Sequence, residues 1–489
     1  MAWALALLVV PTSALAHDPE EHDQATGHEP ATVGPDLRQN LRLLASSPLA
    51  DRAANNPNAG SDLAFWGERA YAGNYGGFRI FHISQPSSPR LLSDIRCFGP
   101  QNDVSVWNNR ILILSVDAPQ TTERCGSSRT TTYAQTPDAF EGLRIFDVSN
   151  PSEPEFLTAV RTDCGSHTNT VVPDLANDRL LVYVSSYALG AGAIGPDCAA
   201  PTAESPVSHD KVSIVEVQLG QPEDAEVINE PSSMFEGGQV CTPSTVNPLV
   251  AGDRDFICNP TDDDTRPFAS RGCHDIQVLA GARLAACSAL AEGHLWDISD
   301  PEEPRLLKRV DNPNVEFWHN ASFTYDGRIV AFSDEAGGGV EAWCKPGDPD
   351  TIGANWFYPV PGDATEPLGH FKPERTTTGN CTAHNGNFLP VRGRYVYTQA
   401  WYSLGTSVSD LTDLANPREI AFFQAGDRTP EDATNTSADT WSSYFYRGFV
   451  FTNDIHRGFE SLFLGDPARR QARRLGHENP QTQERVLFP

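Results

Sequence analysis

The feature that most constrains this chain is a short phrase that recurs along it. Apolar residues, then Asp or His, Ile or Val, and Ser run into Pro-x-x-Pro at residues 78–89, 143–154 and 294–304. Weaker copies lie at 212–217, 408–417 and 461–467. The alternation predicts a β-strand, and the Pro residues end its pairing. A strand unit repeated at this period restricts the fold to a ring or an array of similar units.

A second phrase lies upstream of each copy and predicts a hairpin. It consists of a short strand, a turn usually carrying Gly or Asn, an Arg and an apolar strand. It occurs at residues 65–71, 106–112, 171–181, 278–285, 323–330, 388–396 and 445–450. Each repeat therefore has four strands, and no helical periodicity accompanies them.

Seven such units predict an all-β fold, a single seven-bladed β-propeller of four-stranded blades spanning residues 41–480. The blades are expected to start near residues 61, 102, 167, 274, 319, 384 and 441. A ring of blades needs a closing strand so that no edge stays open. We expect residues 41–46, which precede the first repeat, to pair into the last blade.

The phrases at residues 78–84, 143–149 and 295–299 resemble those of the LVIVD-repeat proteins, a group of exported bacterial and archaeal β-propellers. The resemblance covers most of residues 60–470. It implies the propeller fold and a location outside the cytoplasm. It implies no reaction, because members of the group are mostly of undefined function.

The N-terminus predicts export. Residues 1–16 contain an apolar run too short to span a bilayer, followed by an A-x-A cleavage pattern at residues 14–16, which is typical of a signal peptide. Residues 17–40 predict a polar, His-containing tail, and residues 481–489 predict a second tail. No transmembrane segment is predicted, so the expected location is secreted, periplasmic or at the cell surface.

Cysteine content and charge agree with that location. The ten Cys are even in number and favour disulfides in an oxidising compartment, although their pairing stays open. The formal net charge of −28 argues against nucleic acid as a partner, because binding it requires a basic surface. No GxSxG elbow, P-loop or dinucleotide fingerprint occurs in its expected context.

Four histidines occupy one register of the repeat. The position four residues before the first apolar anchor of each hairpin is occupied by Ser61, Asn102, His167, His274, His319, His384 and Trp441. The first strands of the blades surround the channel of a propeller, so the four imidazoles are expected to converge at one mouth. Neutral imidazoles bind divalent transition metals, here Cu, Fe, Zn or Mn of unknown identity.

A structural role for these histidines is the alternative. Each ring could instead bond to a hydroxyl of its own blade, for which the sequence offers Ser185, Ser288, Ser333 and Thr398.

Loop residues are expected at the same mouth. Asp334, Glu335, Asp454 and His456 are candidates for a metal ligand, for its hydrogen-bond partner or for a general base. Each of them singly could also be an ordinary surface group. Insertions at residues 117–140, 188–210 and 231–272 carry Cys125, Cys198, Cys241 and Cys258 and predict a disulfide-stapled cap over the mouth.

Two functions follow from these patterns. One is a metal-dependent enzyme, an oxidoreductase or a hydrolase, acting on a small molecule at the capped mouth. The other is a non-catalytic binding or scaffold propeller whose partner is a small molecule or a surface protein. Ring nitrogens that converge on one point would favour the first function.

Overall fold

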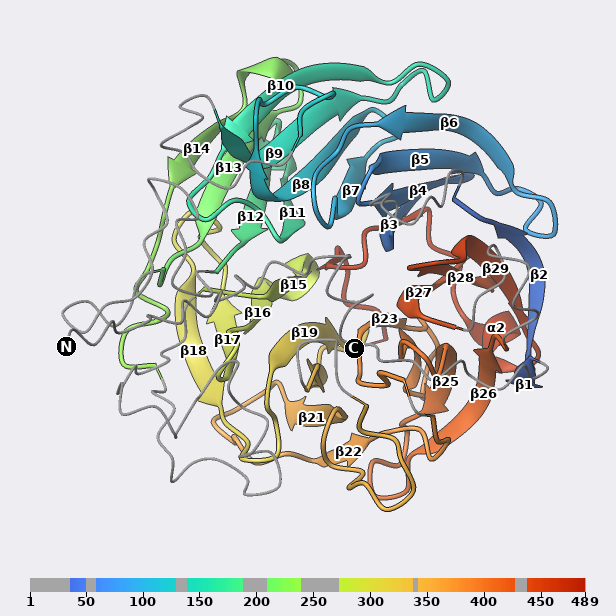
Figure 1. Ribbon diagram of the computed structural model, residues 1–489. Coiled ribbons are helices and arrows are strands. Elements are labelled where there is room, and N and C mark those ends of the chain that lie inside the picture. The colour runs from blue at the N-terminus through green and yellow to red at the C-terminus, as the bar shows by residue number, and fades with distance from the viewer. Residues whose placement is uncertain are drawn as a thin grey trace, which may run out of the picture.

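The computed structural model describes residues 36–49, 59–128, 139–187, 209–238, 272–336, 342–377, 379–426 and 438–488. The described chain is all-β and propeller-like, with its sheets arranged in a ring around a centre (Figure 1). The predicted signal peptide lies outside the described residues. Among the described residues, no helix has the length and apolar character that crossing a membrane requires.

Five sheets each contain four strands that follow one another in the chain and pair in that order. The first sheet contains β3 Gly60–Trp66, β4 Arg69–Asn74, β5 Gly77–His82 and β6 Arg90–Arg96, and the second contains β7 Val104–Trp107, β8 Ile111–Gln120, β9 Phe140–Asp147 and β10 Glu155–Arg161. The third contains β11 Thr168–Asp174, β12 Arg179–Ser185, β13 Ser213–Gln218 and β14 Glu226–Asn229, and the fourth contains β15 Asp275–Leu279, β16 Leu284–Ser288, β17 Gly293–Asp297 and β18 Arg305–Val310. The fifth contains β19 Trp318–Phe323, β20 Ile329–Asp334, β21 Asn355–Pro359 and β22 Gly369–Phe371.

The rest of the ring is one nine-stranded sheet, where the sequence predicted two separate blades. Two inner strands, β23 and β27, pair in parallel over two residues, Asn385 with Ser442 and Gly386 with Ser443, and this short contact joins the neighbouring units. The sheet contains β1 Leu37–Gln39, β2 Leu41–Ser47, β23 Asn385–Phe388, β24 Val396–Ala400, β25 Thr406–Asp410, β26 Arg418–Gln424, β27 Thr440–Tyr446, β28 Phe449–Asp454 and β29 Gly458–Leu464.

The recurring phrase has a local physical cause. Asp147 and Asp297 end their strands, and each carboxylate accepts the backbone N–H of the Ser two residues later at 2.8 Å. Such a bond closes a turn that the following Pro cannot extend as a strand. The second strands of the blades are almost fully buried, whereas outer strands such as β6 are half exposed, so the apolar faces lie between blades.

The predicted closing strand is confirmed. β2 pairs antiparallel with β29, from Leu41 opposite Leu464 to Ser47 opposite Phe459. The N-terminal tail is shorter than expected, because Leu37–Gln39 form β1 and pair with β26. The N-terminal strands β1 and β2 therefore lie in the same sheet as the late strands β26 and β29.

A C-terminal segment, residues 476–488, closes the other end of the channel (Figure 1). β30 His477–Glu478 pairs with the end of β3, and β31 Thr482–Gln483 pairs with the end of β15. Further hydrogen bonds join this segment to other inner strands. They pair Asn479 with Val106, Thr482 with Val171, Gln483 with Phe323, Glu478 with Asn387 and Gly476 with Tyr446. The sequence predicted a tail from residue 481. Instead of forming a solvated tail, the polar side chains of this segment bond to the edges of inner strands in the channel.

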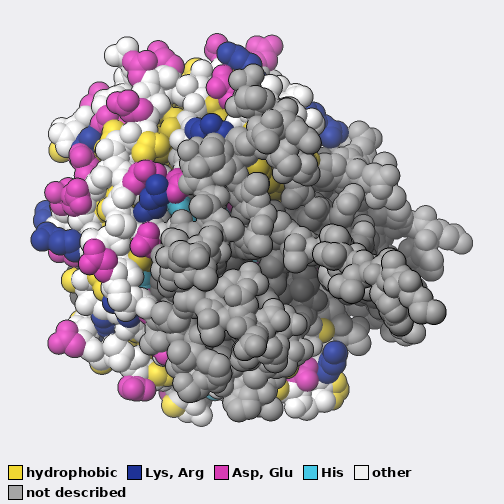
Figure 2. Space-filling view, turned by 60° about the vertical axis from the view of Figure 1, so that its left-hand side comes forward, with side chains coloured by type: hydrophobic (Ala, Val, Ile, Leu, Met, Phe, Trp, Pro, Cys, Tyr) yellow, Lys and Arg dark blue, Asp and Glu magenta, His cyan; other side chains and the backbone are white. Residues whose placement is uncertain are grey.

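Disulfides and the surface follow the sequence expectations. Cystines join Cys97 to Cys125, Cys273 to Cys287 and Cys344 to Cys381. Cys198, Cys241 and Cys258 of the predicted cap lie outside the described residues. On the face shown in Figure 2, Asp and Glu side chains are spread over the described surface with Lys and Arg between them.

Replacing Asn479 should destabilise the whole ring. Its side-chain amide donates to the carbonyl of Val106 at 2.8 Å and accepts the N–H of the same residue at 2.9 Å. Asn479→Ala leaves both buried groups without their partner, so we expect the free energy of unfolding to fall by about 1–3 kcal/mol per orphaned group. Urea denaturation measures it. Gln471→Ala on the exposed helix α2, Ala468–Gln471, is the control. A loss no larger than that of the control would contradict a structural role for the C-terminal segment.

Candidate metal centre at the histidine cluster

The four register histidines form one continuous cluster. His167 and His384 come directly before β11 and β23, His274 directly before β15, and His319 is the second residue of β19. Neighbouring ring centroids are 4.1, 4.1 and 4.3 Å apart along this order. Each residue is at most 2% exposed. The shared register therefore brings side chains from the starts of four inner strands into contact, as a row of rings.

Two of these rings are oriented by the backbone of the next inner strand around the ring. His274 Nδ1 donates to the carbonyl of His319 at 3.1 Å, and His384 Nδ1 donates to the carbonyl of Trp441. A carbonyl only accepts, so the proton of each neutral ring lies on Nδ1 and the lone pair on Nε2. Backbone carbonyls orient metal-binding histidines in the same manner.

Glu335 supplies a carboxylate to the cluster. It follows β20 directly and is fully buried. Its Oε2 lies 3.5 Å from His319 Nε2, its Oε1 lies 3.5 Å from His384 Nε2, and the hydroxyl of Tyr402 donates to Oε1. One ligand atom each from His274, His319 and Glu335 lie within 4.8 Å of one another. Two imidazoles and a carboxylate are a donor set that suits Zn²⁺ and Fe²⁺.

His167 is the first ring of the row and lies beside the carboxylate of Asp117. Its Nδ1 lies 2.8 Å from Asp117 Oδ2 and 3.1 Å from the hydroxyl of Tyr187, whose ring stacks on that of His274. Burial lowers the pKa of His167, but the negative charges of Asp117, Asp275 and Glu335 outweigh it and raise the pKa above its ordinary value. His167 is therefore more inclined to carry a proton than an ordinary histidine.

The hydroxyls of the structural alternative do not hold the rings. Ser185 Oγ, Ser288 Oγ and Thr398 Oγ1 have no hydrogen-bond partner among the described residues. Ser333 Oγ instead bonds to the backbone of Asn320. The ring nitrogens bond instead to the carboxylate of Asp117 or to backbone carbonyls of the next inner strand.

The other predicted loop residues take different positions. Asp334 accepts three backbone N–H groups, from Glu316, Phe317 and Gly353. Asp454 likewise accepts the N–H groups of Asp439, His456 and Arg457. The side chain of His456 is 39% exposed and lies 3.2 Å from Asp439. These contacts favour roles in holding loops, whereas Glu335 lies against the histidine cluster.

Sequence reasoning missed three contributors to the cluster, namely Asp117, Tyr187 and Tyr402. Tyr187 and Tyr402 each lie two residues beyond the end of a second strand, β12 and β24. That shared spacing was a usable signal, since Glu335 lies in the equivalent loop of its own blade. Asp117 lies inside β8 and carries no such mark.

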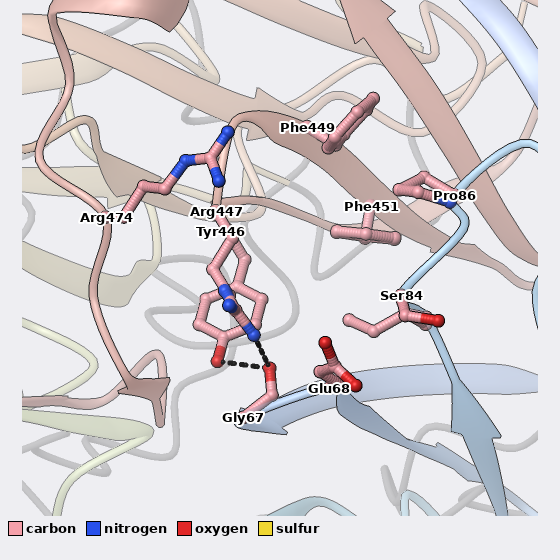
Figure 3. A pocket seen from close by; sticks show the side chains of 10 residues that line it. Gly67, Glu68, Ser84, Pro86, Tyr446, Arg447, Phe449, Phe451 and Arg474 are labelled. Atoms are coloured by element: carbon pink, nitrogen blue, oxygen red, sulfur yellow. Dashed lines mark hydrogen bonds between the residues drawn. The ribbon is translucent and has the colours of Figure 1, made fainter.

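The pocket in Figure 3 lies at the opposite end of the strands. Its cavity of about 270 Å³ is lined by the β3–β4 and β27–β28 turns, including Gly67, Glu68 and Arg447. Arg447 Nη1 and the hydroxyl of Tyr446 both donate to the carbonyl of Gly67, at 2.7 and 2.9 Å. This pocket is therefore separate from the histidine cluster, which lies where the inner strands begin.

Comparison with solved structures finds distant likenesses. Putative 6-phosphogluconolactonases from Bacteroides uniformis and Bacteroides fragilis each match with a TM-score of 0.44 at 9% identity, over 78% and 82% of this chain and 85% and 89% of theirs. The computationally designed Ika8 protein matches with a TM-score of 0.42 at 9% identity, over 86% of this chain and 99% of its own. No curated protein matches the sequence. At this level of similarity, the activities of these proteins say nothing about the activity of this chain.

The fold and the site define an all-β, propeller-like protein with a buried cluster of histidines and one glutamate. The family model of the LVIVD repeat matches residues 133–162, which contain β9 and β10. The chain therefore contains an LVIVD repeat, in agreement with the resemblance of its recurring phrases.

Removing the charge of Asp117 should lower the pKa of His167 in metal-free protein. Since the folded pKa is raised above the ordinary 6.5, the Asp117–His167 pair stabilises the fold fully below about pH 6.5 and loses this effect as pH rises through the folded pKa. The stability difference between wild type and Asp117→Asn should therefore shrink at high pH. NMR titration of ¹³C-labelled histidine measures the pKa, with Asp350→Asn beside His370 as the control. An unchanged pKa of His167 would refute the pairing.

Proposed function

We propose that this chain is an exported, metal-dependent enzyme acting on a small molecule, with one transition-metal ion held by His274, His319 and Glu335. The proposal rests on the proximity of their ligand atoms, which lie within 4.8 Å of one another on three buried side chains. Ligand distances near 2.0–2.2 Å place adjacent donors about 3–4 Å apart, so small side-chain adjustments suffice. His384 lies beside Glu335 as a further donor, and His167 is the fourth ring of the row.

The surroundings support a reactive role for such an ion. The hydroxyl of Tyr402 bonds to Glu335, and the tyrosine ring packs 4.7 Å from that of His384. Tyr187 packs near the other end of the row, against His167 and His274. A bound ion would supply Lewis acidity or, for Fe or Cu, electron transfer, so its identity decides between hydrolase and oxidoreductase. Glu335, if displaced from the ion, is also positioned to move a proton.

The proposal includes a seven-bladed ring and a location outside the cytoplasm. We count β23–β26 as a sixth blade and β27–β29 with β2 as a seventh, joined through the short β23–β27 contact. Three cystines support an oxidising compartment, in line with a signal peptide at residues 1–16. The substrate or partner would enter at the mouth where the inner strands begin, beneath the insertions predicted to cap it.

Metal content tests this function directly. The full-length secreted protein, dialysed against chelator and repleted with Cu, Fe, Zn or Mn in turn, should retain about one equivalent of one metal. His319→Ala and Glu335→Gln should each lose it, because each removes one of three clustered donors. His82→Ala, a partly exposed histidine on β5, is the matched control and should load like wild type.

The outcomes separate the two functions. Retention of metal by His319→Ala would place the ion elsewhere and reject this centre. Wild-type protein that retains no metal would favour the non-catalytic binding or scaffold propeller, with the histidines as structural groups.

A further inference from the structure

Three polar side chains outside the histidine cluster form a second constellation in the third blade. Ser186 follows β12, His209 precedes β13, and Asp163 lies between β10 and β11. Ser186 Oγ is 2.9 Å from His209 Nε2, and His209 Nδ1 is 3.0 Å from Asp163 Oδ2. Ser186 and His209 are 1% exposed and Asp163 is 7% exposed. A hydroxyl, an imidazole and a carboxylate are thus joined in series.

The bonding order sets the proton positions. The ionised carboxylate of Asp163 only accepts, so His209 carries its proton on Nδ1 and offers the lone pair of Nε2 to the hydroxyl of Ser186. This is the order in which a base activates a serine and a third group orients the base. Such a relay is recognised by geometry and roles, and not by order along the chain.

Asp163 is held ionised within the constellation. Lys211 Nζ lies 2.9 Å from the same Oδ2 that accepts from His209. Burial raises the pKa of Asp163, but the bonds from His209 and Lys211 outweigh it and lower the pKa below its ordinary value. The carboxylate therefore keeps the charge that stabilises a protonated His209.

A metal site is the competing use of these residues. Ligand atoms of Asp163, Cys164 and His209 also lie within 4.8 Å of one another. Cys164 is disulfide-bonded, so its sulfur is no thiolate and cannot serve as a metal ligand. Only two donors remain, which is fewer than a stable site requires. The chemistry left to the group is proton transfer.

We propose that Ser186 is a nucleophile that hydrolyses small carboxylic esters, with His209 as its base and Asp163 as the residue that positions the base. Ser186 Oγ forms a bond to the acyl carbon while its proton passes to His209 Nε2 and the carbonyl electron pair moves to oxygen. The carbon–alkoxy bond then breaks, and the leaving alcohol takes the proton from His209. Water next attacks the acyl-serine, giving its proton to His209, which returns it to Ser186 Oγ as the acid leaves.

This activity is independent of the metal proposed above. The two sites adjoin, since Tyr187 follows Ser186 and stacks on His274, but none of the three relay residues is among the proposed ligands. Ester hydrolysis consumes only the ester and water. Chelator-treated protein should therefore keep it.

The test uses the full-length protein and a small alkyl fluorophosphonate. The phosphorus bonds to an activated serine Oγ as fluoride leaves, and intact-mass spectrometry followed by peptide mapping locates the adduct. We expect one adduct, on Ser186, before and after chelator dialysis. Ser186→Ala should abolish it, and His209→Gln should slow labelling by about 100-fold or more. Ser185→Ala, the neighbouring buried hydroxyl on β12, is the matched control and should label like wild type.

Asp163→Asn keeps the shape of the side chain and guards against a His209 variant that fails to fold. It should slow labelling by about 10²–10⁴-fold, because it no longer fixes the proton on Nδ1. Thermal unfolding confirms that each compared variant is folded. Wild-type protein that forms no adduct on Ser186, or equal labelling rates in wild type and a folded Asp163→Asn or His209→Gln variant, would overturn the proposal and leave a structural hydrogen-bond network.

Discussion

The structure depends on satisfying the backbone edges of the inner strands. Each blade presents one edge to the channel, where the inner strands are buried and an unpaired N–H or C=O group is costly. At the end of the strands the C-terminal segment meets this need, since Asn479, Thr482 and Gln483 bond to backbone groups of three different blades. At the start of the strands side chains of one blade meet it by bonding to the next. The same requirement thus shapes both ends of the channel.

The histidine cluster is a product of that second solution. His274 and His384 each donate from Nδ1 to a carbonyl of the next inner strand, so a bond that joins inner strands also leaves Nε2 without that acceptor. Glu335 adds a buried negative charge, which burial alone would make costly. Its distances to His319 and His384 and the bond from Tyr402 supply compensation. In the proposed metal centre, Nδ1 of each of these two rings bonds to the backbone and Nε2 would be left for the ion.

Sequence reasoning succeeded where a repeat carried the information. The recurring phrases predicted the all-β propeller class, the pairing of β2 with β29 and the register that brings His167, His274, His319 and His384 into contact. Features that occur once could not be predicted in this way. The C-terminal segment resembles a solvated tail because its polar side chains bond to strands far away in sequence. Ser186, His209 and Asp163 come from three separate segments with no spacing that marks them. The β23–β27 contact depends on a two-residue approach that no residue type announces.

The closing strand has a consequence for the order of events in synthesis. β2 lies near the N-terminus and emerges early, yet its partner β29 is almost the last strand of the chain. The contact therefore spans nearly the whole sequence and carries a large entropic cost of closure. Until the end of the chain is available, β2 has no edge to join and the channel has no C-terminal segment. Closure of the ring is thus a whole-chain event, which can follow the pairing of the individual sheets only after the last strands have been synthesised.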